Sequence, residues 1–293
     1  MNSVWPASVV GLIFGLGLSA CDPQPRRQPV ERVRELNEIP IAQLRVMLKG
    51  FPGDWRTAGE ISTQGQEPPA QKTVLPGSKL ISLLAPAQIN LGVMSVRDAI
   101  AARRSARKFS DVQISLEELS YLLWATQGVT GIQQEDSGEI LLRYRAAPSA
   151  GGRYPLETYL AIQRVEGLAK GLYRYLPNEH QLVLIREDAR LSEDVGTACY
   201  GIPAAKDAAV IFIWSATPNR TEWKYAYLAH RMIAMEAGHV CENLYLAAES
   251  CRIGVCALLS YHQPRLDELL GLDGVEEFTI YLACIGKSAE AEK

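Results

Sequence analysis

The sequence predicts an α+β protein with a central mixed or antiparallel sheet, flanked by helices of which one is long. Apolar residues recur at helical spacing over 222–251, which is enough for a helix of about 30 residues. Strand signals lie on either side of it, over 157–163, 208–214 and 278–285. Helices and strands do not alternate regularly, which favours an α+β fold over a doubly wound parallel sheet.

Composition and charge limit the class of protein. The chain has 293 residues, of which 47% are hydrophobic and 22% are charged, and its formal net charge is −3. Such a chain fits one large or two small globular domains. The near balance of charge argues against a protein that binds nucleic acid through counterion release. The chain's 6 cysteines are too few for a disulfide-dense scaffold, and no Cys-x-x-Cys pair occurs.

The N-terminal segment predicts export. Residues 1–20 carry no charged side chain, and the apolar run 9–18 is shorter than the ~20 residues that span a membrane. The stretch Leu18-Ser19-Ala20-Cys21 resembles the lipobox of bacterial lipoproteins. It implies a signal peptide over 1–21 and a lipid on Cys21. Asp22, which follows Cys21, resembles the signal that retains many such lipoproteins at the periplasmic face of the inner membrane. An uncleaved anchor helix is the alternative, and a cytoplasmic protein is expected if 1–21 is not a signal. Most of the other cysteines are expected to be buried and inert.

The next segment, 22–90, is rich in proline and poor in periodicity. We therefore expect a tether or arm there, and a single domain over 91–293.

Start signals place two helices at the beginning of this domain. Ser95-x-x-Asp98 predicts a helix start, and apolar residues follow it at helical spacing. Ser115-x-x-Glu118 is a capping box, which predicts a helix that ends at Gly128.

The middle of the chain predicts strands. The alternating segment 157–163 indicates a strand, and 171–176 and 181–185 flank the turn residues 177–180 as in a hairpin. The near-continuous apolar run 208–214 is typical of a strand buried on both faces.

The last third predicts the long helix over 222–251, with Gly254 as its C-cap. Pro264 is expected to start a short helix up to Leu270. The final strand is expected over 278–285.

Three stretches have side chains suited to binding a cofactor or moving a proton. Three arginines and a serine lie within 103–107, and guanidinium groups suit phosphate oxygens. Two glycines within 148–155 allow a backbone to approach a flat ligand closely. Lys224 beside Tyr225 offers two groups for proton transfer. Taken alone, each stretch also fits a plainer role: a solvated basic turn, a tight loop and an exposed helix start.

Further motifs accompany these stretches in a fixed order. They are Arg103-Arg104-Ser105-Ala106-Arg107, Ser149-Ala150-Gly151, Tyr154-Pro155-Leu156-Glu157, Lys224-Tyr225, Glu236-Ala237-Gly238-His239-Val240, Asn243-Leu244-Tyr245-Leu246-Ala247-Ala248 and Leu269-Leu270-Gly271-Leu272. Together they resemble the FMN-dependent nitroreductases and, more narrowly, the SagB/ThcOx-type dehydrogenases. The resemblance runs from about Leu91 to Lys287.

The resemblance implies the nitroreductase-like fold, bound FMN and an intertwined homodimer with its flavins at the subunit interface. It also implies the residues that bind FMN. Arg103, Ser105 and Arg107 would hold the phosphate, with Arg104 near the isoalloxazine or ribityl chain. The remaining contacts would come from Ser149, Ala150 and Gly151 along the flavin ring, the turn Gly254-Val255-Cys256 toward flavin N5 and O4, and Lys287 as a further phosphate ligand.

The reaction that the resemblance implies is hydride transfer between an organic substrate and flavin N5. Lys224 and Tyr225 would be the catalytic pair that assists proton abstraction. In the azoline-oxidising members of the family, the substrates are thiazolines and oxazolines in peptides. A small molecule or a peptide-derived substrate is therefore expected.

Two other functions stay open. An NAD(P)H-dependent nitro- or quinone reductase would use the same fold, although nicotinamide pools are cytosolic and export argues against them. A flavin-free, membrane-anchored scaffold would need no cluster of arginines at 103–107, and the intact motif argues against it.

Overall fold

The centre of the fold is a strand that is buried on both faces. In the computed structural model, which describes residues 65–289, β7 (Val210–Ala216) is buried along its whole length. Phe212 and Trp214 belong to one hydrophobic core, and Ile211 and Ile213 belong to the other. Successive side chains of a strand point to opposite faces, so β7 lies between two helical layers, as its apolar run predicts.

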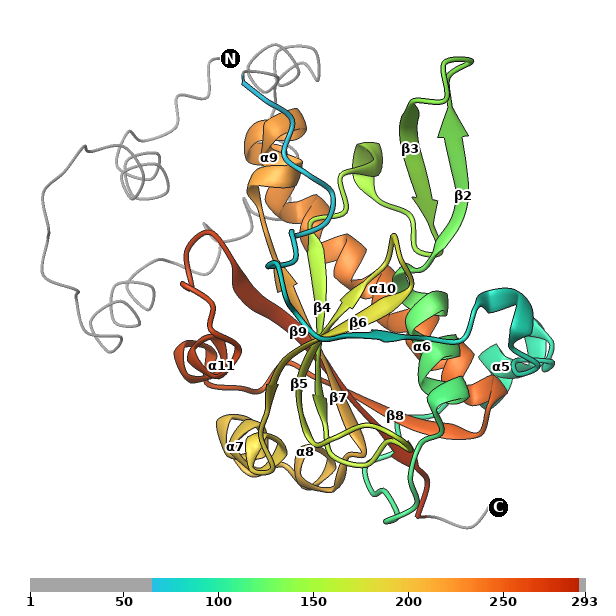
Figure 1. Cartoon of the computed structure of the whole chain (residues 1–293). Coiled ribbons are helices and arrows are strands. Elements are labelled where there is room, and N and C mark those ends of the chain that lie inside the picture. Colours follow the sequence, from blue (N-terminus) through green and yellow to red (C-terminus); the bar gives the residue numbers. More distant parts are fainter. Residues whose placement is uncertain (1–64, 290–293) are drawn as a thin grey trace, which may run out of the picture. The chain divides into compact units, whose positions relative to one another are not determined.

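The sheet around β7 is antiparallel throughout. The strands of the described residues are β1 (Leu80–Ser82), β2 (Val129–Gln134), β3 (Ile140–Arg145), β4 (Leu156–Ile162), β5 (Gly171–Leu176), β6 (Gln181–Glu187), β7 (Val210–Ala216), β8 (Ile253–Leu258) and β9 (Phe278–Lys287). A 7-stranded sheet has the order β1-β6-β5-β4-β7-β9-β8, and each pairing in it is antiparallel. β2 and β3 form a separate hairpin that projects from the domain (Figure 1).

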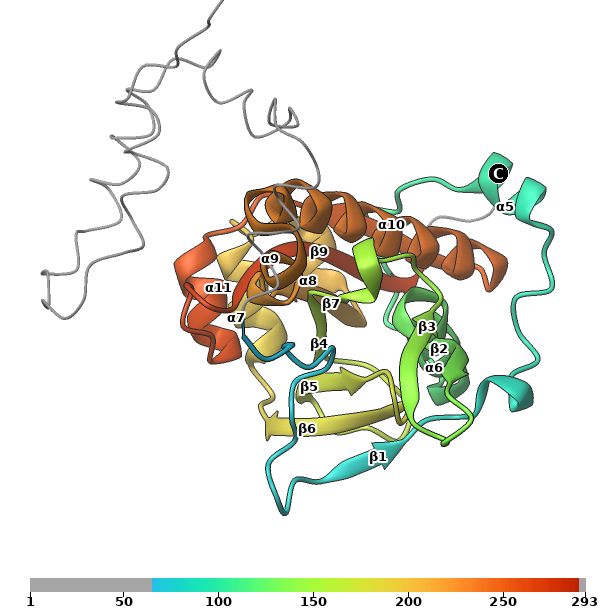
Figure 2. The same cartoon turned by 90° about the horizontal axis from the view of Figure 1, so that it is seen from above.

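Helices cover both faces of the sheet. They are η2 (Pro86–Gln88), α5 (Val96–Ala102), α6 (Leu116–Gln127), η3 (Ala150–Gly152), α7 (Leu191–Ala198), α8 (Pro203–Asp207), α9 (Asn219–Tyr225), η4 (Ala226–Leu228), α10 (Ala229–Ser250) and α11 (Gln263–Leu270). α6 and α10 pack into the first core, whereas α7, α8 and α11 pack into the second. Figure 2 shows α10 along one side of the sheet. The predicted α+β fold with an antiparallel sheet and a long helix is confirmed.

The predicted helix starts are confirmed atom by atom. The Ser95 hydroxyl accepts a hydrogen bond from the Asp98 amide at 3.1 Å, and α5 begins at the next residue. Ser115 and Glu118 make both bonds of the capping box, at 3.1 and 2.9 Å. α6 ends at Gly128, as its sequence predicts.

The long helix differs from its prediction in two details. Helical residues run from Asn219 to Ser250, but Ala226 has φ 44° and ψ −130°, outside the helical region, so a short α9 precedes α10. Lys224 and Tyr225 therefore lie at the end of α9 and not at the start of one long helix. Gly254 is not the C-cap: α10 ends at Cys251, and Gly254 lies inside β8.

The part of the 22–90 segment that the structure describes lies against the domain. β1 pairs with β6 at the edge of the sheet. Arg174 donates hydrogen bonds to the carbonyl oxygens of Lys72 and Thr73, both at 2.9 Å. We call residues 67–74 the strap. The sequence predicted no strand in this segment, and it also missed β2, β3, β8, α7 and α8.

Several of the expectations concern residues outside 65–289. The signal segment 1–21 and Cys21 are among them, so export and lipidation stay predictions. Within 65–289, no helix has the length and apolar character of a membrane span. The cysteines described there are all free, and burial raises the pKa of each thiol. Only Cys251 among them is not fully buried.

Candidate functional site

The arginine motif 103–107 lies beside the start of β8. Ser105 forms a parallel bridge with Val255, and the Ala106 amide donates to the Val255 carbonyl oxygen at 2.9 Å. A β-carbon at Gly254 would lie 2.6 Å from the Ala106 β-carbon. Glycine is therefore required at position 254 for this close approach, and not for a helix end.

Tyr245 of α10 contacts the arginine motif through its hydroxyl group and its ring. Its hydroxyl oxygen lies 3.1 Å from Ser105 Oγ and accepts a hydrogen bond from the Ala257 amide at 2.8 Å. The Arg103 guanidinium carbon lies 5.3 Å from the centroid of the Tyr245 ring, within the range of a cation–π contact. One tyrosine thus links α10, β8 and the motif. We call Arg103, Arg104, Ser105, Arg107 and the start of β8 the arginine cluster.

The arginine cluster carries positive charge that nearby carboxylates do not neutralise. Among residues 65–289, no ion pair involves Arg103, Arg104 or Arg107, and Arg104 donates only to the carbonyl oxygens of Ala101 and Arg103. Lys287 lies one strand away, since its β9 position pairs with Ile253. Its ammonium group forms an ion pair with Glu118. The arrangement suits an anion with several charged oxygens.

The second predicted group gathers around η3. Gly151 has φ 61°, and a β-carbon there would lie 2.6 Å from the Tyr225 hydroxyl oxygen and 3.0 Å from Lys224 Nζ. Glycine at 151 therefore allows the end of α9 to contact the loop. Lys224 Nζ lies 5.9 Å from the centroid of the Tyr225 ring. We call Ser149, Ala150, Gly151, Lys224 and Tyr225 the loop cluster.

A buried carboxyl group supports the loop cluster from α10. Glu236 is almost fully buried, and its carboxyl group lies near the Ser149 hydroxyl and the Ala150 amide. Burial raises the pKa of Glu236 from 4.5 to about 7, although Ser149, Ala150 and the nearby Arg145 and Arg220 oppose the rise. Its Oε1 atom has no hydrogen-bond partner within the described residues. The carboxyl group can therefore change its protonation near neutral pH.

Replacing Glu236 with Gln is expected to flatten the pH dependence of stability. Because its pKa is raised to about 7 in the folded protein, the unfolded chain loses this proton first as pH rises from 4.5 to 7. The free energy of unfolding of the wild type should fall through this window by up to about 3 kcal/mol and level off above it. Glu236→Gln cannot ionise, so this fall should shrink. Urea unfolding at pH 5 and pH 8 measures it, and equal falls in both proteins would contradict the assignment.

A buried ion network joins the loop cluster to the strap. The Glu157 carboxylate accepts from Arg220 at 2.5 Å, from Arg174 at 3.2 Å and from the Lys72 amide at 2.7 Å. Arg220 also donates to the Tyr154 carbonyl oxygen at 2.9 Å. Arg220 belongs to α9, which ends at Lys224–Tyr225. The network therefore fixes the position of the candidate catalytic pair.

The structure gathers the predicted residues into two groups and not one. Tyr245 contacts the arginine cluster and Glu236 contacts the loop cluster, and their nine-residue separation on α10 corresponds to about 13 Å along the helix axis. Sequence reasoning quoted Tyr245 and Glu236 within motifs but gave neither a role. Glu236 lies at helical spacing with Ile233 and Val240, which are buried, and that spacing was the available signal.

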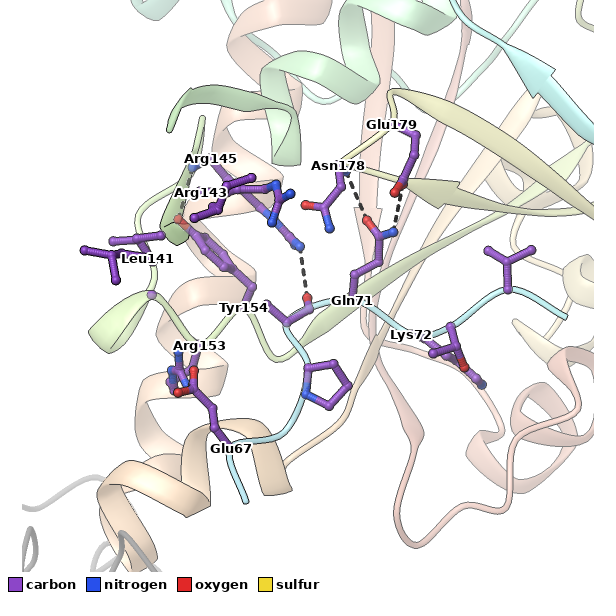
Figure 3. Close-up of a pocket in the computed structure, with 17 residues that line it drawn as sticks. Glu67, Gln71, Lys72, Leu141, Arg143, Arg145, Arg153, Tyr154, Asn178 and Glu179 are labelled. Carbon is purple, nitrogen blue, oxygen red and sulfur yellow. Dashed lines mark hydrogen bonds and ion pairs between the residues drawn. The ribbon is translucent and has the colours of Figure 1, made fainter. Parts of the chain in front are cut away.

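A pocket of about 540 Å³ opens beside the loop cluster (Figure 3). Its walls come from the strap, β3, the turn between β5 and β6, and the residues Gly152–Tyr154 that follow Gly151. Nothing in the sequence predicts this pocket, because the strap, β3 and the turn between β5 and β6 are far apart in the chain.

Comparison with known families and proteins agrees with this geometry. The model of the Nitroreductase family matches residues 100–287. A Methanocaldococcus jannaschii protein that carries a nitroreductase name is 30% identical over 197 residues, which are 67% of this chain and 93% of that protein. The trifolitoxin-processing protein TfxB of Rhizobium leguminosarum is 25% identical over 166 residues. That match covers 55% of this chain and 44% of TfxB.

Solved structures share the fold. A Ralstonia eutropha structure described as a nitroreductase has a TM-score of 0.59 and 26% identity, and the match covers 78% of this chain and 98% of that one. A chain of the E. coli microcin synthetase McbBCD complex, with truncated pro-MccB17 bound, has a TM-score of 0.55 and 18% identity. It covers 88% of this chain and 97% of that one, and it shows the fold alone.

Proposed function

The chain belongs to the nitroreductase family of oxidoreductases, and from this premise we propose that it is an FMN-dependent dehydrogenase or oxidase of the SagB/ThcOx type. The observation that carries the proposal is the pair of clusters that lie against α10 at Tyr245 and Glu236. One presents guanidinium groups without carboxylate partners among the described residues, and the other presents a Lys–Tyr pair against a glycine. Family membership also favours an enzyme over a flavin-free scaffold.

The residues present fit FMN. Arg103, Ser105 and Arg107 offer charged and neutral donors for a phosphate group, and Gly254 and Val255 bring the backbone of β8 against them. Lys287 would add a further positive charge once it exchanges Glu118 for the phosphate. In the loop cluster, Ser149, Ala150 and Gly151 present backbone with little side-chain bulk, which suits a flat ring.

The mechanism that we propose divides the work between the clusters. Bound FMN supplies the hydride chemistry. The arginine cluster holds the phosphate and so fixes the orientation of the cofactor. Lys224 Nζ takes the proton that leaves the substrate, and the Tyr225 hydroxyl next to it holds the substrate by a hydrogen bond. Glu236 keeps Ser149 and Ala150 in place, and the Glu157 network keeps α9 in place.

A homodimer would bring the two clusters together. Met235 and His239 are exposed on α10. Val96 and Ile100 of α5 are exposed as well, and so is Val93, which precedes this helix. Exposed apolar side chains in this number favour a protein interface. We propose that a second copy packs there, so that the loop cluster of one copy faces the arginine cluster of the other.

The proposed class of substrate is supported by one relative. TfxB is named for processing trifolitoxin, and this supports an organic substrate within a peptide or derived from one. The 30% identity to the Methanocaldococcus jannaschii protein favours a second candidate, an NAD(P)H- or quinone-linked nitroreductase. The electron donor distinguishes the two: reduction of the bound flavin by NADH or NADPH would favour the reductase.

The first experiment measures FMN and its loss in a variant. We expect the purified full chain to carry one FMN per chain in a dimer, seen by absorbance and by mass. Arg103→Ala should weaken FMN binding about tenfold or more, because one charge-assisted hydrogen bond to the phosphate is lost. Arg190→Ala removes an exposed arginine before α7, outside the motif and the proposed dimer face, and should leave FMN affinity unchanged. Equal FMN affinity in wild type and Arg103→Ala would refute the phosphate assignment, and a chain that takes up no FMN would refute the function.

A further inference from the structure

The pocket beside the loop cluster has the size of a small-molecule site. Its volume of about 540 Å³ falls within the ~300–1,000 Å³ that such sites occupy. It lies between the strap on one side and β3 on the other, and the Asn178–Glu179 turn closes one end. Figure 3 shows Arg143 and Arg145 extending from β3 toward this turn.

Two arginines of the pocket form no ion pair with any residue that the structure describes. Arg143 and Arg145 are two residues apart on β3, and therefore share one face of the strand. Within residues 65–289, no hydrogen bond or ion pair involves the Arg143 side chain. Arg145 is 7% exposed, donates through Nη2 to the Ala70 carbonyl oxygen at 2.9 Å, and leaves its buried Nε without a partner.

Most of the other charges of the pocket are already paired. Lys72 forms an ion pair with Glu277, and Arg153 forms one with Glu67. Among the described residues, the Glu179 carboxylate accepts a hydrogen bond only from the uncharged Gln71 amide at 2.8 Å, so its negative charge stays in the pocket. The two β3 arginines outweigh this single carboxylate, and the pocket therefore has a net positive charge.

The pKa of Arg145 also indicates that its positive charge is not fully compensated. Burial lowers the pKa of Arg145 from 12.5 to about 10, and Arg220 adds to the lowering. Glu157 opposes it, but Glu157 is itself shared between Arg174 and Arg220. A bound anion would offset the cost of keeping this guanidinium charged away from water.

Part of the lining is apolar. The residues concerned are Pro69, Val74, Ile140, Leu141 and Leu142. An occupant that satisfies both parts of the pocket has an apolar body and one anionic end. A phosphate, with close to two charges, would also meet Glu179 at the rim, whereas a planar carboxylate matches the fork of one guanidinium.

We propose that this pocket binds an organic carboxylate with an apolar body. The carboxylate lies between Arg143 and the free Nε edge of Arg145, and the body lies along Leu141 and Leu142. The site is separate from the proposed FMN contacts, and binding there does not require FMN. Gly152 lines the pocket whereas its neighbour Gly151 contacts Lys224, so an occupant lies next to the candidate catalytic pair.

Calorimetric titration of the purified full chain tests the proposal. The probes are 4-phenylbutanoate and its uncharged amide, together with the tripeptide Leu-Leu-Leu with a free or an amidated C-terminus. We expect at least one of the two acids to bind about tenfold or more tightly than its amide. Arg143→Gln should abolish this preference. Arg190→Gln removes an exposed arginine far along the chain and should keep it.

The outcomes show whether the carboxylate belongs to a small acid or to a peptide, and whether the pocket recognises a carboxylate at all. Preference for 4-phenylbutanoate identifies a small acid, and preference confined to the peptide identifies a peptide C-terminus; both support carboxylate recognition. Arg145→Lys, which keeps the charge but loses the fork, should weaken the preference without unfolding the chain. Equal affinity for acid and amide, no binding of either acid, or an unchanged preference in Arg143→Gln would overturn the proposal. FMN content, measured on the same samples, reports separately on the proposed function.

Discussion

Replacing Glu157 with Gln is expected to lower the free energy of unfolding by about 3–5 kcal/mol, the range for breaking a buried ion pair from one side. Glu157 is 3% exposed, and Arg174 and Arg220 are as deeply buried. Glutamine is nearly isosteric, so the change removes charge and not volume. The loss comes from two guanidinium groups that stay buried without a counter-charge.

The hydrogen bonds reinforce this expectation. Oε1 of Glu157 accepts from the Lys72 amide and from Arg220, and Oε2 accepts from Arg174. Either orientation of a glutamine amide would point its NH₂ group at one of these donors. At least one donor would then lose its partner, which adds to the cost of the missing charge.

Urea unfolding of wild type and Glu157→Gln at pH 7 measures the difference. Glu193→Gln, an exposed position at the start of α7, is the matched control and should change stability by less than about 0.5 kcal/mol. A loss below about 1 kcal/mol in Glu157→Gln would show that the network adds little to stability. In that case its role would be to position the strap and α9.

Local signals in the sequence were sufficient for most elements. Ser95 and Ser115 mark helix starts because a capping bond joins residues three apart, and both bonds are present. The strand β7 was predicted from its own continuous apolar residues, without reference to any other part of the chain. Gly254 was misread because a helix end and a close approach of two chain segments both require glycine, and the sequence alone does not tell them apart.

Long-range partners left no such signal. The partners of Glu157 come from the strap, β5 and α9, and no sequence pattern near position 157 predicts these ion pairs. The pocket could not be predicted from the sequence for the same reason. Arg143 and Arg145 line a pocket only because the strap packs opposite β3, and no local pattern predicts that packing. For the candidate site, resemblance supplied the motifs, and the structure added Tyr245 and Glu236 as the residues that hold them.

Replacing Lys224 with Ala is expected to slow flavin reduction by the substrate about 10²–10⁴-fold, the usual contribution of a positioned acid or base. Its FMN content should stay that of the wild type, because the proposed phosphate contacts lie on the other cluster. Lys224 meets the loop at Gly151, beside the Tyr225 hydroxyl. The alanine variant removes the amine and leaves the Glu157 network and the Glu236 contacts intact.

Stopped-flow absorbance of the flavin measures this rate, with a thiazoline-containing peptide and NADH as the two donors to compare. Lys170→Ala, at an exposed position, is the control and should react as the wild type does. The two readouts separate chemistry from binding: a slow rate with full FMN content places Lys224 in proton transfer, whereas loss of FMN would show that it holds the cofactor. An unchanged rate with both donors would remove Lys224 from the mechanism. The proton that leaves the substrate would then have to pass to another group, and the Tyr225 oxygen, which also lies at Gly151, is the next candidate acceptor.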